Sequence, residues 1–598
     1  HRLIRRQRQM CIRDRYISTF AMSSTQSSDL KDILEFVKRA EGSFPEDLCE
    51  VRESTLGGMG VVAKKDLSAG TALLSLPKSS VFSASNSCIA NLLHDAQIDG
   101  VLALNIAFIY ETTVFRETSH WTPYLKSIVP GALPPAYWSD NDKKLLKGTT
   151  LDTLFDALSP QEEVQSGFEV AIDLAETWNE EFGLEIPKEY LSIDINDMDD
   201  VRRKFHKFVS VAYALSARVF EIDAFHESAL VPVADLFNHH VVRPDLQFVS
   251  LYDVCDLCGE SGMCKHMLAE EIEAARDEEE LRERSKSPKV EKPRSNDKAE
   301  VAISSSVIAQ LEKDLAEELG EQLKMQEVDK PRELDPDDCV DMTLSRDIEA
   351  GEEIFNSYGD LSNVFLLTRY GFTIERNPYD IVHLGAQIME HTAHNEALRE
   401  RTNWWANTGY DLFSNWFKIA FPEEEHEHTE GCDHDHDGEH EHTDDCDHDH
   451  DDEHSDDDDD SGEEEDGEES EDAEASDEEE EEQESEQPWL SELEVDYTGQ
   501  ATPSLIALCT LLSMKPEEVT DLMSKAEEQP DSFEQLISEE NMATSGKVVR
   551  QIAEAYKTKL EEAATQSASE IDAEQAACAK NLVLAETSII EKLLESLE

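Results

Sequence analysis

The chain has 598 residues, 39% of them hydrophobic, and a formal net charge of −82 at pH 7. This length suffices for two or three domains with their own cores. The deficit of Lys and Arg argues against direct binding to nucleic acid, and the longest apolar run, Val101–Tyr110, is too short to cross a bilayer.

The first 21 residues are rich in Arg and differ from everything that follows. They suit either a transit peptide or a translated adapter sequence, with Met22 as the true start. We favour the adapter interpretation and leave this segment out of the fold prediction. The eleven cysteines form no evenly spaced framework, which indicates a reducing compartment, nucleus or cytosol.

A short pattern occurs twice, far apart in the chain. Ala63–Leu74 reads AKKDLSAGTALL, and Leu344–Phe355 reads LSRDIEAGEEIF. Each copy has a short apolar strand before it and another after it, with Asp and Gly placed for the turn, which is a hairpin signal. Two such hairpins predict that the beginning and the end of one β-rich domain come together in space.

The rest of the chain is mainly helical in pattern. Residues 89–222 show helical periodicity, with Ser159-Pro160 as a helix start, and residues 255–335 form a charged insertion with one or two exposed helices. After Phe372 the pattern is helical again, and it resumes after residue 487. We predict an α+β fold: a β-rich domain (22–380), then a helical domain (381–422 and 488–598).

The helical domain is interrupted by an acidic segment, residues 423–487, with 39 Asp and Glu and no Lys or Arg. Such a composition predicts disorder. The segment begins with the unit EHEHTEGCDHDHDG, which is repeated almost unchanged. Its histidines alternate with acids, so it could bind Zn²⁺ or Ni²⁺ weakly. We favour a solvated polyanion that attracts basic proteins over long range.

Three dispersed pieces suggest a site. They are the glycine loop Gly57–Gly60, the sequence Asp235–His239, and the segment Gly351–Phe372, in which Tyr358 precedes a glycine. Taken singly, each has an ordinary alternative: a tight turn, a structural Asn-His pair and a half-buried core tyrosine.

In combination these pieces resemble the SET-domain lysine methyltransferases. The relevant sequences are the glycine loop, SARVF at Ser216–Phe220, ADLFNH and GEEIFNSYG, joined by WTPYLKSIVP and LLTRYGF. They are similar to the branch of the Rubisco large-subunit and ribosomal lysine methyltransferases. The resemblance covers roughly Asp47–Tyr379 without the charged insertion, and extends more loosely to YKTKLEEA and the final helix. It implies a SET domain with a helical insertion, followed by a helical substrate-binding domain.

The resemblance also implies S-adenosylmethionine as cofactor. Gly58, Met59 and Gly60 would line it with main chain, because glycine allows close approach. Arg218 would pair with its carboxylate. Asn238 and His239 would meet its adenine end, in part through backbone.

The resemblance further implies Tyr358 as the catalytic residue for methyl transfer to a lysine amine. That amine must first lose its proton, and an apolar channel lowers its pKa. Phe220 and Tyr370 would form aromatic walls of the lysine channel, and Asp235 would lie at its edge.

A second chemistry lies in the charged insertion. Cys255, Cys258, Cys264 and His266 form a C-x2-C-x5-C-x-H string, whose ligand types suit tetrahedral zinc. The alternative is a set of unliganded, reduced cysteines. A zinc ion here would stabilise a loop and take no part in methyl transfer.

The sequence therefore predicts an S-adenosylmethionine-dependent protein-lysine N-methyltransferase. The expected partner is a basic protein substrate. A large-subunit ribosomal protein is the leading candidate, and histones or other non-histone proteins are the alternative. We expect a monomer in the nucleus or the cytoplasm. Two other hypotheses stay open: a catalytically silent SET-fold binding module, and a metal buffer or acidic chaperone that functions through its tail.

Overall fold

A computed structural model describes residues 24–268 and 338–597, apart from residues 55, 57, 252–253, 262–263 and 423–487. The predicted leader, most of the charged insertion and the acidic segment therefore lie outside the described residues. The chain divides into two compact units. The first comprises His1–Ile388, Glu494–Ala501 and Arg550–Glu598, and the second comprises Met389–Leu493 and Thr502–Val549. The predicted domain boundaries stay predictions.

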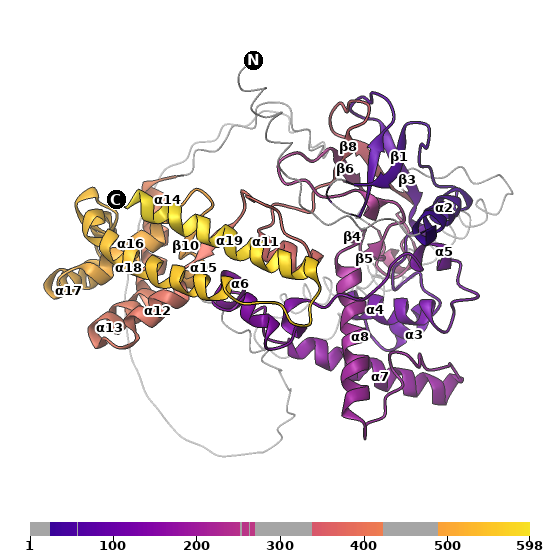
Figure 1. Ribbon diagram of the computed structural model, residues 1–598, viewed down its shortest axis with the longest axis horizontal. Coiled ribbons are helices and arrows are strands. Elements are labelled where there is room, and N and C mark those ends of the chain that lie inside the picture. Colours follow the sequence, from indigo (N-terminus) through magenta and orange to yellow (C-terminus); the bar gives the residue numbers. More distant parts are fainter. Residues whose placement is uncertain are drawn as a thin grey trace, which may run out of the picture. The chain divides into compact units, whose positions relative to one another are not determined.

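The first unit contains all the described strands, in small antiparallel sheets. They are β1 (Cys49–Glu53), β2 (Met59–Ala63), β3 (Ala72–Pro77), β4 (Val219–Glu221), β5 (Ser228–Leu230), β6 (Leu246–Val249), β7 (Cys339–Leu344), β8 (Glu353–Ile354), β9 (Ile381–His383) and β10 (Glu494–Asp496). The strand orders are β1-β2-β8, β3-β7-β6, β4-β5 and β10-β9. Strands and helices share one unit, which confirms the α+β class. Figure 1 shows early strands, such as β1 and β3, beside late ones, such as β8.

The two copies of the repeated pattern do meet, but the predicted hairpins are wrong in their pairing. Strand β2 pairs with β8, and β3 pairs with β7, so each strand of one copy takes its partner from the other. The turns are tied in the same reciprocal way. Asp347 Oδ1 accepts from the Ala69 N–H at 2.9 Å, and Asp66 Oδ1 accepts from the Ala350 N–H at 2.9 Å. The equivalent Asp of each copy thus caps the turn of the other.

Helices surround these sheets in the first unit. They are α2 (Ser24–Arg39), α3 (Ala90–Asp95), α4 (Gly100–Thr112), α5 (Thr122–Leu125), α6 (Thr150–Thr153), α7 (Glu162–Phe182), α8 (Met198–Ser216), α11 (Asn363–Phe365), α19 (Ala573–Ser596), and parts of α12 (Gly385–Ala393) and α18 (Glu539–Ala564). Shorter 3-10 turns are η1 (Lys78–Ser80), η2 (Pro135–Tyr137), η3 (Asp142–Leu145) and η4 (Ala234–Leu236), and η6 (Leu366–Tyr370) is a π-helical turn.

The predicted helical insertion is confirmed. Helix α7 begins at Glu162, slightly later than the predicted start, and ends at Phe182. The next residue, Gly183, has a φ of 69°, which suits a left-handed C-terminal cap. Helix α8 begins at Met198 and packs beside α7 (Figure 1). The side chain of the preceding residue, Asp197, accepts from two backbone N–H groups and caps the helix. Among the described residues, no helix combines the length and the apolar character of a membrane span.

A buried polar cluster joins the C-terminal helices to the rest of the first unit. The Thr150 N–H at the start of α6 donates to Glu586 Oε1 of α19 at 3.0 Å, and the Tyr556 hydroxyl of α18 donates to Glu586 Oε2 at 2.5 Å. Burial raises the pKa of Glu586 to about 8, although both hydrogen bonds act in the opposite direction. Helix α19 also packs on β9 and β10.

The second unit is helical. Its elements are α13 (Glu396–Trp404), the π-helical turn η7 (Trp405–Gly409), α14 (Tyr410–Ala420), α15 (Pro488–Ser491), α16 (Pro503–Ser513), α17 (Pro516–Lys525), η8 (Pro530–Leu536), and parts of α12 and α18. Arg401 of α13 is buried and donates to the carbonyls of Leu511, Leu512 and Met514 at 2.8–2.9 Å. These include orphan carbonyls at the end of α16, so the guanidinium serves as its C-terminal cap.

Candidate functional site

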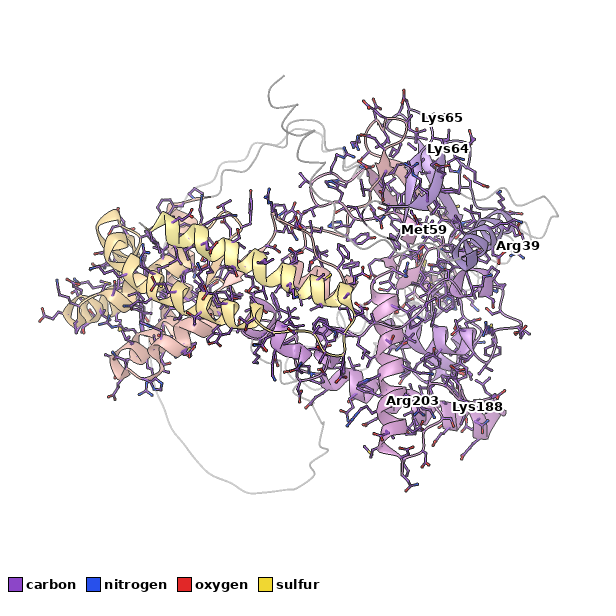
Figure 2. All side chains as sticks on the ribbon, viewed as in Figure 1. Arg39, Met59, Lys64, Lys65, Lys188 and Arg203 are labelled. Carbon is purple, nitrogen blue, oxygen red and sulfur yellow. The ribbon has the colours of Figure 1, made fainter. Side chains whose placement is uncertain are left out.

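The glycine loop leads into β2, and its two described glycines differ in their constraints. Gly58 has a φ of +64° and open space around it. Gly60 is crowded: a Cβ there would lie 2.2 Å from Glu353 Oε1 and 2.9 Å from Asn238 Nδ2. Met59 opens β2, at the end opposite Lys64 and Lys65 (Figure 2). The loop thus brings main chain close to polar side chains from two later segments.

The structure brings the predicted Asn-His pair against the third predicted segment. His239 forms a parallel bridge with Asn356, the Asn356 N–H donates to the Asn238 carbonyl at 2.8 Å, and the His240 N–H donates to the Asn356 carbonyl at 3.1 Å. The Asn238 amide donates to the Met59 carbonyl at 2.9 Å and to Glu353 Oε1 at 2.8 Å. All three predicted pieces therefore converge on Asn238.

Tyr358 is held by several contacts. Its backbone N–H donates to His239 Nδ1 at 3.0 Å, and its hydroxyl donates to the Phe237 carbonyl at 3.1 Å. Its ring stacks on His239, with centroids 4.9 Å apart, and on Tyr370, with centroids 4.8 Å apart. Burial raises the pKa of the Tyr358 hydroxyl. The hydroxyl therefore stays protonated at neutral pH and acts through hydrogen bonding and position.

His239 is neutral and offers one unused donor. Burial lowers its pKa to about 4. Because Nδ1 accepts from the Tyr358 N–H, the ring proton must be on Nε2. Nε2 is buried and has no hydrogen-bond partner in the part of the chain that the structure describes. A buried donor without a partner is costly, so it marks a position where a ligand acceptor would bind favourably.

Arg218 is anchored by a buried carboxylate. Its Nη1 donates to Asp235 Oδ2 at 3.2 Å, and the Tyr124 hydroxyl donates to the same oxygen at 3.2 Å. The Asp235 side chain is 4% exposed, whereas the Arg218 side chain is 39% exposed. Asp235 thus fixes one edge of the guanidinium and leaves its other donors open to a ligand. This contact shows Asp235 as the partner of Arg218; its place at the edge of a lysine channel stays a prediction.

Arg218 and Tyr370 also line one cavity of about 270 Å³. Asp572 and Glu574, at the start of α19, lie on its lining as well, and both are exposed. Phe220 of β4 stacks instead on Phe248 of β6, with centroids 4.9 Å apart. The cavity therefore combines an aromatic ring, a cation and two acidic groups.

Three residues of this site were missed in the sequence. Tyr124 lies in the quoted WTPYLKSIVP, but nothing there indicates that it would reach Asp235. Glu353 looks like a charged turn residue, yet its oxygens accept from Ser54 Oγ at 2.9 Å and from Asn238. Asn356 follows β8 and is buried. Their partners lie more than a hundred residues away, which local patterns do not reveal.

The predicted metal ligands are also brought together. One possible ligand atom from each of Cys255, Cys258, Cys264 and His266 lies within 4.8 Å of the others.

Comparisons with known proteins decide the family. No family model matches the chain. The ribosomal lysine N-methyltransferase 3 of Saccharomyces cerevisiae is 47% identical over 529 residues, 87% of this chain and 88% of that protein. The chain belongs to the ribosomal lysine N-methyltransferase family. The ribosomal lysine N-methyltransferase 4 of Schizosaccharomyces pombe is 25% identical over 56% of this chain and 64% of that protein.

Membership places the chain among the protein-lysine N-methyltransferases and confirms the resemblance drawn from the sequence. A solved structure of Rubisco LSMT bound to sinefungin and monomethyllysine is similar at a TM-score of 0.48 and 13% identity, covering 96% of this chain and 92% of that one. That likeness is too low to add to the assignment.

Proposed function

We propose that this ribosomal lysine N-methyltransferase family member transfers methyl groups from S-adenosylmethionine to a lysine of a large-subunit ribosomal protein. The observation that carries the proposal is the arrangement around Tyr358, whose hydroxyl, backbone and ring are fixed by Phe237, His239 and Tyr370. The relative from Saccharomyces cerevisiae, named a ribosomal lysine N-methyltransferase, supports the substrate class.

The site residues fit S-adenosylmethionine. Its carboxylate suits the open edge of the Arg218 guanidinium, which Asp235 holds in place. The unpartnered His239 Nε2 donor suits an acceptor on the adenine. A Cβ at Gly60 would collide with Glu353 and Asn238, so glycine at this position lets the main chain pack directly against Asn238, beside the proposed cofactor site. When bound, the cofactor supplies a sulfonium-linked methyl group as the electrophile.

Tyr358 acts by positioning. Because burial keeps its hydroxyl protonated, it is no general base at neutral pH. The Tyr358 hydroxyl and the Phe237 carbonyl instead form a polar end to a wall of stacked rings, Tyr370, Tyr358 and His239. Such a wall excludes water and favours the neutral, nucleophilic amine of the target lysine. Holding that amine on the axis of displacement can supply several kcal/mol.

Acidic groups on the cavity favour a basic substrate. Asp572 and Glu574 are exposed on the same cavity as Tyr370. Their charges would attract the Lys and Arg residues that flank a target lysine in a ribosomal protein. Histones are also basic, so they remain the second candidate substrate.

The test is methyl transfer from labelled S-adenosylmethionine to purified large-subunit ribosomal proteins. Tyr358→Phe keeps the ring stack but removes the hydrogen bond to Phe237. We expect this variant to bind cofactor normally and to lose at least 90% of the label transfer (about tenfold or more). Tyr497→Phe, at an exposed tyrosine, is the matched control and should retain activity.

Other outcomes would redirect the assignment. Transfer to histones alone would move the substrate class to the alternative. Measured cofactor binding without transfer to any basic protein would identify a silent binding module.

A further inference from the structure

The chain leaves strand β6 and enters a compact cysteine loop, residues 254–268, of which 262–263 lie outside the described residues. Three thiols and one imidazole of this loop converge. Cys255 Sγ lies 3.6 Å from His266 Nδ1, and Cys264 Sγ lies 3.9 Å from the same nitrogen. One ligand atom from each of these residues and from Cys258 falls within 4.8 Å of all the others.

These separations are close to the edges of a coordination tetrahedron. Bonds of about 2.3 Å from zinc to sulfur and about 2.0 Å to nitrogen, at tetrahedral angles, give sulfur–nitrogen edges of about 3.5 Å and sulfur–sulfur edges of about 3.8 Å. The Cys255–His266 contact of 3.6 Å is of the sulfur–nitrogen length, and the Cys264–His266 contact of 3.9 Å is somewhat longer. The four ligand atoms, all within 4.8 Å of one another, therefore approach the spacing of a tetrahedral site. All three cysteines are free, so disulfide bonding does not account for their convergence.

The backbone of the loop has the turns that such a site needs. The Gly259 N–H donates to the Cys255 carbonyl at 2.7 Å, and the Cys255 N–H donates to the Glu260 carbonyl at 3.0 Å. Gly259 has a φ of +71°, and a Cβ there would lie 2.8 Å from the ring of Phe225. The Met267 N–H donates to Cys264 Sγ at 3.5 Å. Donors to sulfur in this way stabilise thiolate ligands.

The loop has little apolar core of its own. Val254 and Cys255 are buried, but Leu257 is 52% exposed. A four-residue ligand set therefore offers a source of order that apolar packing does not provide here.

We propose that Cys255, Cys258, Cys264 and His266 bind one structural Zn²⁺ ion. All four positions come from the protein, so the site is closed and has no open position for substrate or water. The ion fixes the cysteine loop against the β4–β5 turn, where Phe225 packs on Gly259.

The β4–β5 turn is itself held in place by a buried ion pair and hydrogen bonds. Lys78 Nζ pairs with Asp223 Oδ2 at 2.8 Å and donates to the Leu251 carbonyl at 2.6 Å, and both charged side chains are buried. The Ser250 hydroxyl donates to the Ile222 carbonyl at 2.7 Å. The zinc site thus closes a loop whose entry is held by a buried ion pair.

Cobalt substitution in the full chain tests the proposal. Zn²⁺ is removed under reducing conditions, Co²⁺ is added, and the visible spectrum is recorded. Tetrahedral thiolate coordination should give strong d–d absorption and a sulfur-to-metal charge-transfer band, saturating at one Co²⁺ per chain and bleached by Zn²⁺. This first measurement uses the wild-type chain, so its result does not depend on the folding of a variant.

Matched variants assign the band to this loop, because the acidic segment also holds two cysteines, Cys432 and Cys446. The triple variant Cys255→Ser/Cys258→Ser/Cys264→Ser should abolish the charge-transfer band, whereas the double variant Cys432→Ser/Cys446→Ser and the variant Cys88→Ser, at an exposed cysteine, should keep it. A wild-type protein without this band would overturn the proposal. A band lost only in the Cys432/Cys446 variant would overturn it equally.

Discussion

Replacement of Gly60 by Ala tests the geometry of the glycine loop, which we propose lines the cofactor. The new Cβ would lie 2.2 Å from Glu353 Oε1, so the Glu353 carboxylate must move. That movement breaks its hydrogen bonds with Ser54 Oγ and with the Asn238 amide. Each such bond contributes about 0.5–1.5 kcal/mol, so the free energy of unfolding should fall by about 1–3 kcal/mol.

The matched control is Gly70→Ala. Gly70 has a φ of +79° and open space around it, so Ala there is strained by about 1–2 kcal/mol without touching the site. Both variants should therefore lose similar stability in urea unfolding, but only Gly60→Ala displaces Asn238. We expect the Kd of S-adenosylmethionine, measured by isothermal titration calorimetry, to rise about tenfold in Gly60→Ala, the equivalent of one lost contact of about 1.4 kcal/mol.

The two variants separate loop geometry from general destabilisation. A Kd within twofold of the wild type for Gly60→Ala would refute the reasoning. An equal rise in Gly70→Ala would also refute it.

Three further predictions concern charge. Asp235→Asn keeps the size of the side chain but weakens the ion pair that holds Arg218. The Kd of the cofactor should therefore rise severalfold, while turnover at saturating cofactor persists. An unchanged Kd would contradict the role of Asp235 in positioning Arg218. Glu586 has a folded pKa of about 8 against an ordinary 4.5, so the folded state holds the extra proton between these values. The stabilisation from this proton is complete below pH 4.5 and is lost as the pH rises toward 8, so the free energy of unfolding should fall by about 1.4 kcal/mol per pH unit in that range. Urea unfolding of Glu586→Gln should show no such fall. If the free energies of unfolding of wild type and variant change with pH in parallel, the assignment to Glu586 is wrong. Deletion of residues 423–487 should raise the apparent KM for a basic protein and weaken its salt dependence, and an unchanged KM at low salt would contradict the electrostatic hypothesis.

The repeated pattern shows what local sequence can and cannot predict. The Asp and Gly spacing correctly predicted two similar turns and their meeting in space. It could not predict that β2 would pair with β8 and β3 with β7, because strands with the same turn chemistry can pair within a copy or between copies. Asp66 and Asp347 each have their partner in the other copy, and only the folded chain shows this exchange.

In the candidate site, too, some residues could be found from sequence motifs and others only from the fold. Tyr358, Asn238 and His239 stand in recognisable motifs, and the structure brings them into contact, while their roles stay predictions. The residues that hold these side chains in place could not be found in this way. Glu353 and Tyr124 act through partners far along the chain, so neither residue type nor spacing identifies them. Asp235 stood in a motif, but its contact with Arg218 emerges only from the fold.

We propose that this chain methylates a lysine of a ribosomal protein and that Tyr358 positions the reacting amine. The most direct test of this proposal is mass spectrometry of large-subunit ribosomal proteins incubated with S-adenosylmethionine and either the wild-type chain or Tyr358→Phe. We predict a mass increment of whole methyl groups on a defined lysine of one protein, present with the wild type and absent with the variant. The same increment with both proteins, or no increment with either despite bound cofactor, would refute the proposed role of Tyr358 or the proposed activity, respectively.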